Sequence, residues 1–536
     1  MMSHSSNSIE IEIESPVRVR TRTAGLQRGA DSRRPPETDD VTGVRHTRSD
    51  MHDLAIVESR ADRASVHVCD RLRELADWDR CEDDARSEAD GGGTYYRLEG
   101  DSSRVELRSF EAFHLELERP VAAFDCEPDL LVFASRHSGD TGALLTGHFT
   151  GNFGPAEFGG EDDAVAEACP NALAALLEAF DEHAPEGYDV GMECTHHGPT
   201  DVGCPSLFAE LGSGDEQWDD PDGATAVARA ILELRGVAAH RQQLERDAPA
   251  SRRNREAIPR RHVVGFGGNH YAPRFERVVR ETPWAVGHVA ADWALEAMGH
   301  PSAHRDVLEA AFAASDADIA LVDGEWPVLE ETLADLGYRL VSETWLREVG
   351  DRPLELVGAV ESELGAVDDG VRFGDRSASP ESVVVVDLPG ELVDTAEGID
   401  PERVREIVAS HSVAFATENG GSRVGARVAV PDGDGTADEA DEADGSAGDC
   451  DGAASIRETI VADLAAVLET KYDAVSLEAD AIVAERTAFD PALAREAGVP
   501  EGPKFGALAG GESVTVDGDR IGPEQVRRQQ VDRFPR

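Results

Sequence analysis

The stretch Glu193-Cys194-Thr195-His196-His197-Gly198-Pro199-Thr200 ends a predicted strand and sets a carboxylate, a thiol and two adjacent imidazoles within five residues. Neighbouring side chains on a strand point to opposite faces, so both imidazoles reach one site only if the backbone turns. Gly198-Pro199 supplies such a turn. Two neutral imidazoles beside a carboxylate can hold a catalytic metal or move a proton. A His pair in a surface loop is the alternative, and the octapeptide alone leaves both open.

Short apolar runs alternate with helical patterns on both sides of this stretch, between about residues 54 and 345. We expect strands at 54–58, 130–135, 143–148, 188–195, 207–211, 262–266, 284–288, 319–323 and 338–342. Helices are expected at 62–76, 170–183, 222–243, 289–299, 304–315 and 328–336. This alternation predicts an α/β fold with a mixed or parallel central sheet flanked by helices. In such sheets the ligand site lies at the carboxyl ends of strands, where 193–197 falls.

The composition changes along the chain and suggests four parts. Residues 1–50 are polar and balanced in charge, which predicts a disordered N-terminal extension. We expect the catalytic α/β domain at 51–345 and an insertion at 346–454 that includes an acidic linker at 432–452. The small C-terminal lobe, 455–536, should then pack on the core.

The net charge is the extreme feature of the composition, because 107 acidic residues face 51 basic ones and give −56 over 536 residues. Dense carboxylates are typical of salt-adapted surfaces, since at about 1 M salt the Debye length falls to roughly 3 Å and screens self-repulsion. Seven scattered cysteines without C-x2-C spacing indicate reduced thiols. No apolar run approaches the ~18 residues of a membrane span, so we expect a cytoplasmic protein without membrane contact.

Histidines stand at four predicted strand ends, and three of the adjoining turns contain glycine. Besides His196-His197 they are His148 in 145–154, which Glu157 follows, His270 in 265–275, and His288. Each alone could be a core or loop residue, but a catalytic zinc needs about three His or carboxylate ligands and an open position. The motifs H-E-x-x-H and G-x-S-x-G are absent, which argues against zincin peptidases and α/β-hydrolases. Cys194 is expected to be a packing thiol on the strand face away from the site.

These stretches resemble the archaeal and plant type of D-aminoacyl-tRNA deacylase. The matching segments are 147–152, 193–200, 205–208, 267–275, 287–288 and 504–506, with T-H-H-G-P and H-Y-A-P-R-F the most specific blocks. The resemblance covers about 52–345 and 455–536, and leaves 1–50 and 346–455 outside the family core as lineage insertions. Two positions depart from the family pattern, Cys194 for a small residue and Asn269 for Thr.

The resemblance implies a phosphorylase/hydrolase-like fold and a zinc-dependent hydrolase that cuts the ester between a D-amino acid, such as D-Tyr, and the terminal ribose of tRNA. It implies two zinc ions per chain, with ligands among His148, His196, His197, His270 and His288. Besides His196 and His197, the expected catalytic residues are two carboxylates, Glu193 and Glu157, one of which would be the general base. Substrate would be bound by Gly151, Asn152, Gly267, Gly268, Tyr271 and Arg274.

The expected partner is D-aminoacyl-tRNA, with no DNA, and the protein is expected to be a monomer. The tRNA phosphates could be contacted by Arg274 and Arg277 or by the basic cluster Arg252, Arg253, Arg255, Arg260 and Arg261. Two other classes stay open: another tRNA- or nucleoside-processing hydrolase on the same scaffold, such as a peptidyl-tRNA hydrolase-like enzyme, and a non-catalytic metal- or tRNA-binding protein.

Overall fold

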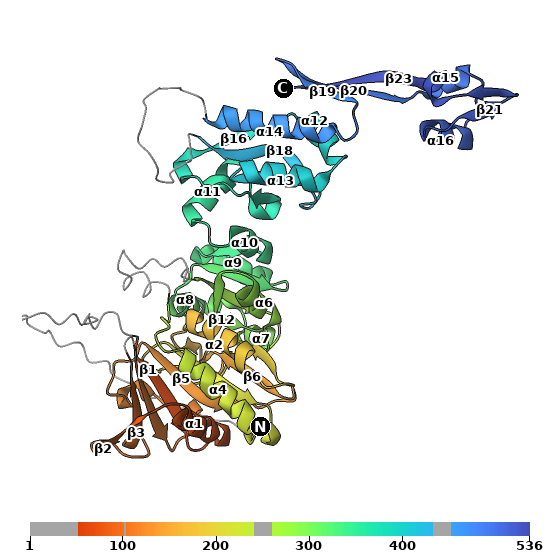
Figure 1. Cartoon of the computed structure of the whole chain (residues 1–536). Coiled ribbons are helices and arrows are strands. Elements are labelled where there is room, and N and C mark those ends of the chain that lie inside the picture. Colours follow the sequence, from red (N-terminus) through yellow and green to blue (C-terminus); the bar gives the residue numbers. More distant parts are fainter. Residues whose placement is uncertain (1–51, 101–102, 241–259, 433–451) are drawn as a thin grey trace, which may run out of the picture. The chain divides into compact units, whose positions relative to one another are not determined.

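The structure is a computed structural model of the chain and describes residues 52–100, 103–240, 260–432 and 452–536 (Figure 1). The predicted disordered extension 1–50, nearly all of the acidic linker 432–452, and Arg252, Arg253 and Arg255 lie outside these residues. Among the helices described, none has both the length and the hydropathy that crossing a bilayer requires.

An eight-stranded mixed sheet forms the first part of the fold, in the order β2-β3-β4-β1-β5-β10-β6-β9. Its strands are β1 (Leu54–Ser59), β2 (Asp79–Asp83), β3 (Gly93–Glu99), β4 (Arg104–Phe110), β5 (Leu130–Arg136), β6 (Leu144–His148), β9 (Asp189–Met192) and β10 (Ser206–Gly212). Helices α1 (Arg63–Leu75) and α2 (Pro170–His183) both pack against α4 (Pro221–Glu233), and the three helices pack on β5, β6 and β10 (Figure 1). The predicted α/β class with a mixed, helix-flanked sheet is confirmed.

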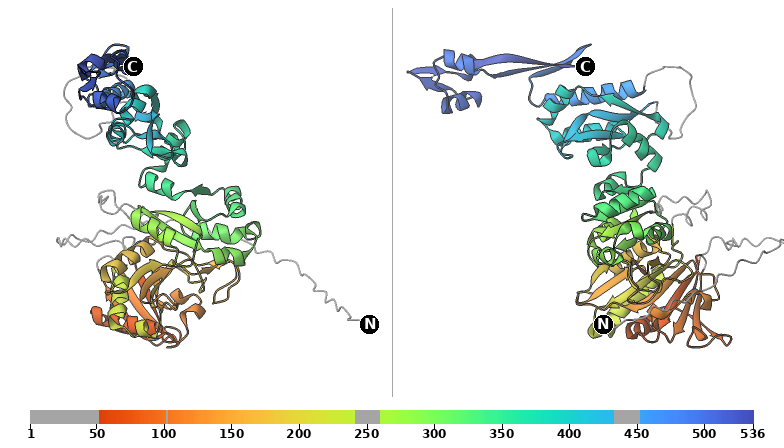
Figure 2. Two further views of the ribbon diagram at one scale, coloured as in Figure 1. Left: turned by 90° about the vertical axis from the view of Figure 1, so that its right-hand side faces the viewer. Right: turned by 180° about the vertical axis from the view of Figure 1, so that it is seen from behind.

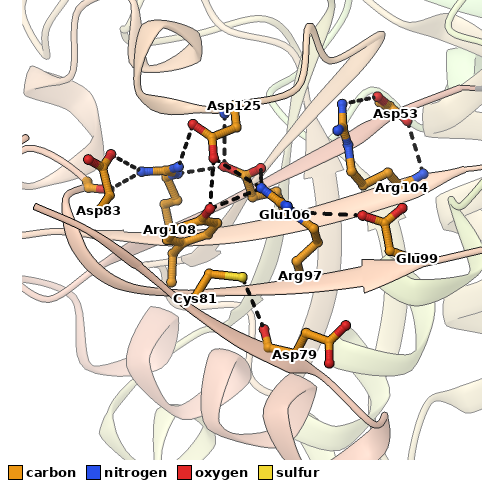
Figure 3. Close-up of polar contacts among 12 residues, drawn as sticks. Asp53, Asp79, Cys81, Asp83, Arg97, Glu99, Arg104, Glu106, Arg108 and Asp125 are labelled. Carbon is orange, nitrogen blue, oxygen red and sulfur yellow. Dashed lines mark hydrogen bonds and ion pairs between the residues drawn. The ribbon is translucent and has the colours of Figure 1, made fainter. Parts of the chain in front are cut away.

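Strands β2, β3 and β4 form an antiparallel extension of this sheet that the sequence pattern did not predict. Charged residues stand at its buried positions (Figure 3). Arg108 has a fully buried side chain that donates to Glu106 Oε1 over 2.6 Å and to Asp83 Oδ2 over 2.8 Å. A buried ion pair inside a strand removes the apolar alternation by which strands are recognised.

A second, all-parallel sheet has the order β12-β11-β13-β14. Its strands are β11 (Arg261–Gly267), β12 (Trp284–Ala290), β13 (Ile319–Asp323) and β14 (Arg339–Val341), joined by α6 (Pro273–Glu281), α7 (Asp292–Met298), α8 (Arg305–Ala314) and α9 (Pro327–Leu336), with α10 (Glu343–Val349) after β14. The single central sheet expected from the sequence is thus two sheets. The segment after β9 joins them, because Cys194 N donates to His270 O and Thr195 N to Val289 O, each over 2.8 Å.

Residues 354–468 form a third α/β unit with its own antiparallel sheet β15-β17-β18-β16 (Figure 2). Its elements are α11 (Leu354–Glu363), β15 (Val371–Phe373), β16 (Val383–Asp387), α12 (Gly390–Glu397), α13 (Pro401–His411), β17 (Ala414–Glu418), β18 (Arg423–Pro431) and α14 (Gly452–Leu468). Helix α14 packs on α12, α13, β16 and β18. The apolar cluster of this unit includes α14 and also Ile482 and Phe534 of the C-terminal segment, so it extends across the predicted boundary between 454 and 455.

The C-terminal residues form a three-stranded antiparallel sheet and a small subdomain. The sheet contains β19 (Ala474–Leu477), β20 (Ala481–Phe489) and β23 (Arg527–Pro535). Between β20 and β23 lie α15 (Pro491–Glu496), α16 (Pro503–Ala509) and the hairpin of β21 (Val514–Val516) and β22 (Asp519–Ile521), around an apolar cluster of their own. The predicted packing of this segment on the catalytic domain stays a prediction.

Candidate active site

Four adjacent strands of the first sheet bring titratable side chains to one place. His137 follows β5, His148 ends β6, Glu193 follows β9, and Glu210 lies within β10. All four side chains are buried, with at most 4% of the residue exposed. Burial of so many ionisable groups is costly unless they pair with each other or with a cation.

A cavity of about 490 Å³ opens beside these residues. It is lined by His137, Glu193, His196, His197, Glu210 and His270, together with Phe113, His114, Leu115, Ser135, Arg136, Ser138 and Phe158. A cavity of this size with a few convergent polar groups is typical of a small-molecule site.

Three histidines form the first group in the site. One ring nitrogen each of His148, His196 and His197 lies within 4.8 Å of the other two. In each ring Nδ1 lies 2.8–3.0 Å from a backbone carbonyl oxygen, at Phe149, Cys194 and Gly198 respectively. A carbonyl only accepts, so Nδ1 carries the hydrogen and the neutral ring keeps its lone pair on Nε2. Histidines that bind a metal are oriented in this way by their other nitrogen.

Burial sets the charge of two of these rings. It lowers the pKa of His196 to about 3 and that of His197 well below its usual value, so both are neutral. Burial also opposes the charge on His148, but the nearby Glu210 carboxylate outweighs it and raises the pKa of that ring. His148 Nε2 lies 3.5 Å from Glu210 Oε1 and, among the residues described, has no hydrogen-bond partner. A cation at this point would satisfy both groups.

The turn predicted at Gly198-Pro199 brings the two adjacent imidazoles into one site. His197 adopts a left-handed backbone conformation, with φ of 47°, and its carbonyl accepts from Gly151 N over 2.8 Å. At Gly198 a side chain would meet backbone, because a Cβ would lie 2.3 Å from Gly160 N. The turn therefore requires glycine at position 198.

Two carboxylates and two imidazoles form the second group. Glu193 Oε1 lies 3.1 Å from His137 Nδ1, and Glu193 Oε2 lies 2.7 Å from His270 Nε2. Burial would raise the pKa of Glu193, but hydrogen bonds from His137 and His270 hold it well below its usual value. Burial would lower the pKa of His137, but Glu193 and Glu210, the latter 3.6 Å away, raise it to about 10. At neutral pH an imidazolium thus lies between two carboxylates.

The family model for D-aminoacyl-tRNA deacylase matches residues 124–341, the part of the chain that supplies both groups. A D-aminoacyl-tRNA deacylase of Halorubrum lacusprofundi is 51% identical over 500 residues, which cover 90% of this chain and 96% of that protein. The chain belongs to the D-aminoacyl-tRNA deacylase family. A second relative of the same name, from Natronomonas pharaonis, is 50% identical over 482 residues and covers 90% and 99% of the two chains.

Among solved structures, a crystal structure of a conserved protein of unknown function matches with 24% identity and a TM-score of 0.45, over 55% of this chain and 97% of the other. The alignment with the Halorubrum deacylase also bears on 346–454. Because it covers 90% of this chain, it cannot leave out the whole of that segment, so part of it is shared with this family member.

Two residues of the site, His137 and Glu210, were not predicted from the sequence of this deacylase family member. His137 follows β5 as His148 ends β6, so its place at a strand end was a usable signal. Glu210 is a lone carboxylate inside the apolar strand β10, where an unpaired charge would be costly. Tyr271, predicted to bind substrate, lies beside His137, with its hydroxyl 3.4 Å from Nε2.

Cys194 is buried, as expected, and burial raises the pKa of its thiol to about 12, which makes it a poor nucleophile. It does not face away from the site, however, because its Sγ lies 3.6 Å from His270 Nδ1. The expected orientation was wrong because the chain leaves β9 at Met192, before this residue, and bonds to the second sheet.

Two predicted chemical residues do not belong to the site. His288 is fully buried, with Nδ1 2.9 Å from Thr195 Oγ1 and Nε2 2.8 Å from Ala166 O, so both nitrogens are used within the protein. The structure therefore removes it from the candidate ligands. Glu157 is exposed and does not line the cavity, which leaves Glu193 as the candidate base.

The predicted substrate-binding residues of the glycine-rich turns mostly serve the fold. Asn152 Nδ2 donates to Gly159 O and Glu161 O, and so braces the following loop. At Gly151 a Cβ would lie 2.7 Å from Val165, and at Gly267 and Gly268 it would lie 1.9 Å and 2.8 Å from Asp323 atoms. The lack of a side chain at these glycines therefore allows close contact with other parts of the protein.

The arginines predicted to meet phosphate are already paired. Arg274 Nη1 donates to Asp323 Oδ1 over 3.0 Å, and its Nε donates to Glu343 Oε2 over 3.3 Å. Arg277 forms two bonds of 2.7–2.8 Å with Glu343. In the basic cluster, Arg260 bonds to Glu178 and Arg261 to backbone carbonyls. The charges of Arg274, Arg277 and Arg260 are therefore offset by carboxylates of the protein itself.

Proposed function

We propose that this protein is a D-aminoacyl-tRNA deacylase, which hydrolyses the ester between a D-amino acid and the terminal ribose of tRNA. Membership of the family and the names of its relatives support the substrate. The observation that carries the chemistry is the group of three imidazoles beside two buried carboxylates. In each ring, a bond from Nδ1 to a backbone carbonyl leaves Nε2 for another partner.

We propose that His148, His196 and His197 hold a zinc ion. The donor set fits, because three imidazole nitrogens lie together and His148 Nε2 is buried without a hydrogen-bond partner in the described part of the chain. Zinc bound there would supply a Lewis acid to the reaction. For the second ion that the family resemblance implies, His137, Glu193 and Glu210 also lie within 4.8 Å of one another, as do Cys194, His196 and His270. The first of these groups could bind an ion only if His137 lost its proton.

The chain's own residues supply proton transfer. We assign Glu193 the role of accepting a proton from the water that attacks the ester carbonyl, since its carboxylate is ionised and lines the cavity. His137, protonated between Glu193 and Glu210, holds both carboxylates in their charged form. The proton then passes to the ribose oxygen as the ester bond breaks, and the products are the free D-amino acid and tRNA.

Deacylation of D-Tyr-tRNA by His148→Ala and His196→Ala tests the proposal. Both variants should lose zinc, measured by elemental analysis, and should lose at least about 100-fold in kcat/KM. His183→Gln is the matched control, because His183 is a half-buried residue at the end of α2 that does not line the cavity and pairs only with Glu233 among the groups described. If both site variants retained zinc and wild-type rates, the assignment of the site would be wrong.

A further inference from the structure

Part of the cavity wall is formed by residues that the proposed chemistry does not use. It includes Phe113, Phe158 and Arg136, the last residue of β5 and the neighbour of His137. An arginine next to the reacting groups, with aromatic rings around it, is a candidate for binding the substrate and not for the chemistry.

Arg136 is held firmly but its charge is not offset by an ion pair. Its guanidinium lies 5.1 Å from the ring centroid of Phe113 and 5.2 Å from that of Trp218. Trp218 is itself fixed, because its Nε1 donates to His137 O over 2.9 Å. Stacking on aromatic rings orients the guanidinium and leaves its N–H groups available at the edge.

Arg136 differs from the arginines of α6 in how its charge is placed. In a chain with about two acidic residues per basic one, Arg274, Arg277 and Arg280 all bond to carboxylates. Across 52–100, 103–240, 260–432 and 452–536, no ion pair joins the Arg136 guanidinium to a carboxylate, although Asp62 accepts from the backbone N of Arg136 and is attracted to its charge from farther away. A cation left unpaired in such an acidic protein, at a cavity, is available to an anion from outside.

Phe158 adds an aromatic face to the same cavity. With 66% exposure it is the most exposed of the large apolar side chains described. The loop that carries it is braced, since Asn152 bonds to the carbonyls of Gly159 and Glu161, and Gly198 N donates to Phe158 O over 3.0 Å. An aromatic ring that a braced loop holds in solvent can stack on a base.

We propose that this part of the cavity binds the unpaired 3′-terminal nucleotides of tRNA, with Arg136 bonded to a phosphate and Phe158 stacked on a base. The inference rests on the proposed function and adds to it the residues that hold the nucleic acid. Counterion release contributes little to binding at molar salt, so a pre-oriented cation and a stacking ring should matter more than net positive charge.

Binding of the trinucleotide CCA and of adenosine, measured by calorimetry at molar KCl, tests the two roles separately. Arg136→Met should weaken CCA binding about tenfold and leave adenosine binding unchanged, because adenosine has no phosphate. Phe158→Ala should weaken both about tenfold. Arg229→Met, which removes an exposed charge on α4, is the matched control and should change neither.

A parallel measurement uses D-Tyr-tRNA as substrate, for which Arg136→Met should raise KM about tenfold with kcat retained. Wild-type CCA binding and KM in Arg136→Met, or no CCA binding by the wild type, would overturn the inference. Thermal unfolding of each variant separates loss of contact from loss of fold. A wild-type protein that binds CCA through these residues yet leaves D-Tyr-tRNA intact would overturn only the proposed function.

Discussion

At the scale of residues, the arrangement around Glu193 separates two tasks. Three histidines offer Nε2 to a cation, while His137 and His270 hydrogen-bond to the Glu193 carboxylate. The same carboxylate lies 3.7 Å from His196 Nε2, so the metal group and the proton-transfer group touch at this point. Because Glu193 is not one of the three proposed zinc ligands, a change at Glu193 should affect catalysis more than metal binding.

Glu193→Gln should lower kcat for D-Tyr-tRNA by about 100- to 1000-fold, since the amide cannot accept the proton. Zinc content should stay near that of the wild type. Glu157→Gln is the matched change of an exposed carboxylate in the adjoining loop, and its kcat should be unaltered. Equal losses in the two variants, measured by single-turnover deacylation, would contradict the assignment of the base.

The sequence contained enough to predict part of this site. His148, Glu193, His196, His197 and His270 all end strands or start turns. The structure brings four of them to one cavity and places His148 beside His196 and His197. The sequence could not predict which polar groups are already hydrogen-bonded or ion-paired within the protein. The partners of His288, Asn152 and Arg274 come from residues up to 122 positions away and are set by packing. Glu210 was not predicted because it is a single charged residue inside an otherwise apolar strand.

At the scale of elements, the turn after β9 determines whether two sheets share one site. Gly198→Ala should cost at least about 2 kcal/mol of unfolding free energy, because the new Cβ would lie 2.3 Å from Gly160 N. Gly358→Ala, inside α11 with open space around it, is the matched control and should stabilise by about 0.5–1 kcal/mol. Chemical denaturation measures both, and a neutral Gly198→Ala would contradict the packing of the turn.

The N-cap of α1 should make stability depend on pH. Asp62 accepts from Ala64 N, and burial raises the pKa of its carboxyl from 3.8 to about 6. Because the folded pKa is the higher one, the fold favours the protonated acid and loses stability as pH rises from about 4 to 6. Asn cannot ionise, so Asp62→Asn should gain up to about 3 kcal/mol relative to the wild type between pH 4 and 7. A difference that stays constant with pH in denaturation experiments would exclude this origin.

Apolar periodicity located most helices and strands of the first two sheets, and β13 and α2 were predicted at their observed bounds. Periodicity failed where charge was buried in β4, and it could not assign strands to separate sheets. Pairing between distant strands depends on how helices cover them, and that information is spread over the whole chain. The role of α14 in the third unit was missed for this reason.

At the scale of the whole molecule, the net charge of −56 should make folding depend on salt. Raising KCl from about 0.1 M to molar concentration shortens the Debye length from about 10 Å to about 3 Å, so repulsion among surface carboxylates falls. The midpoint of thermal unfolding should rise steadily over this range. Scanning calorimetry in a KCl series measures it, and an unchanged midpoint would show that the acidic surface has no such cost.

The central claim is that this protein hydrolyses D-aminoacyl-tRNA with the help of a metal held by His148, His196 and His197. The most direct measurement is deacylation of D-Tyr-tRNA and L-Tyr-tRNA at molar salt, before and after removal of metal with a chelator. The account predicts rapid release of D-Tyr, little release of L-Tyr, loss of activity with the metal and recovery on adding zinc. Equal rates on both substrates, or full activity after the metal is stripped, would contradict it.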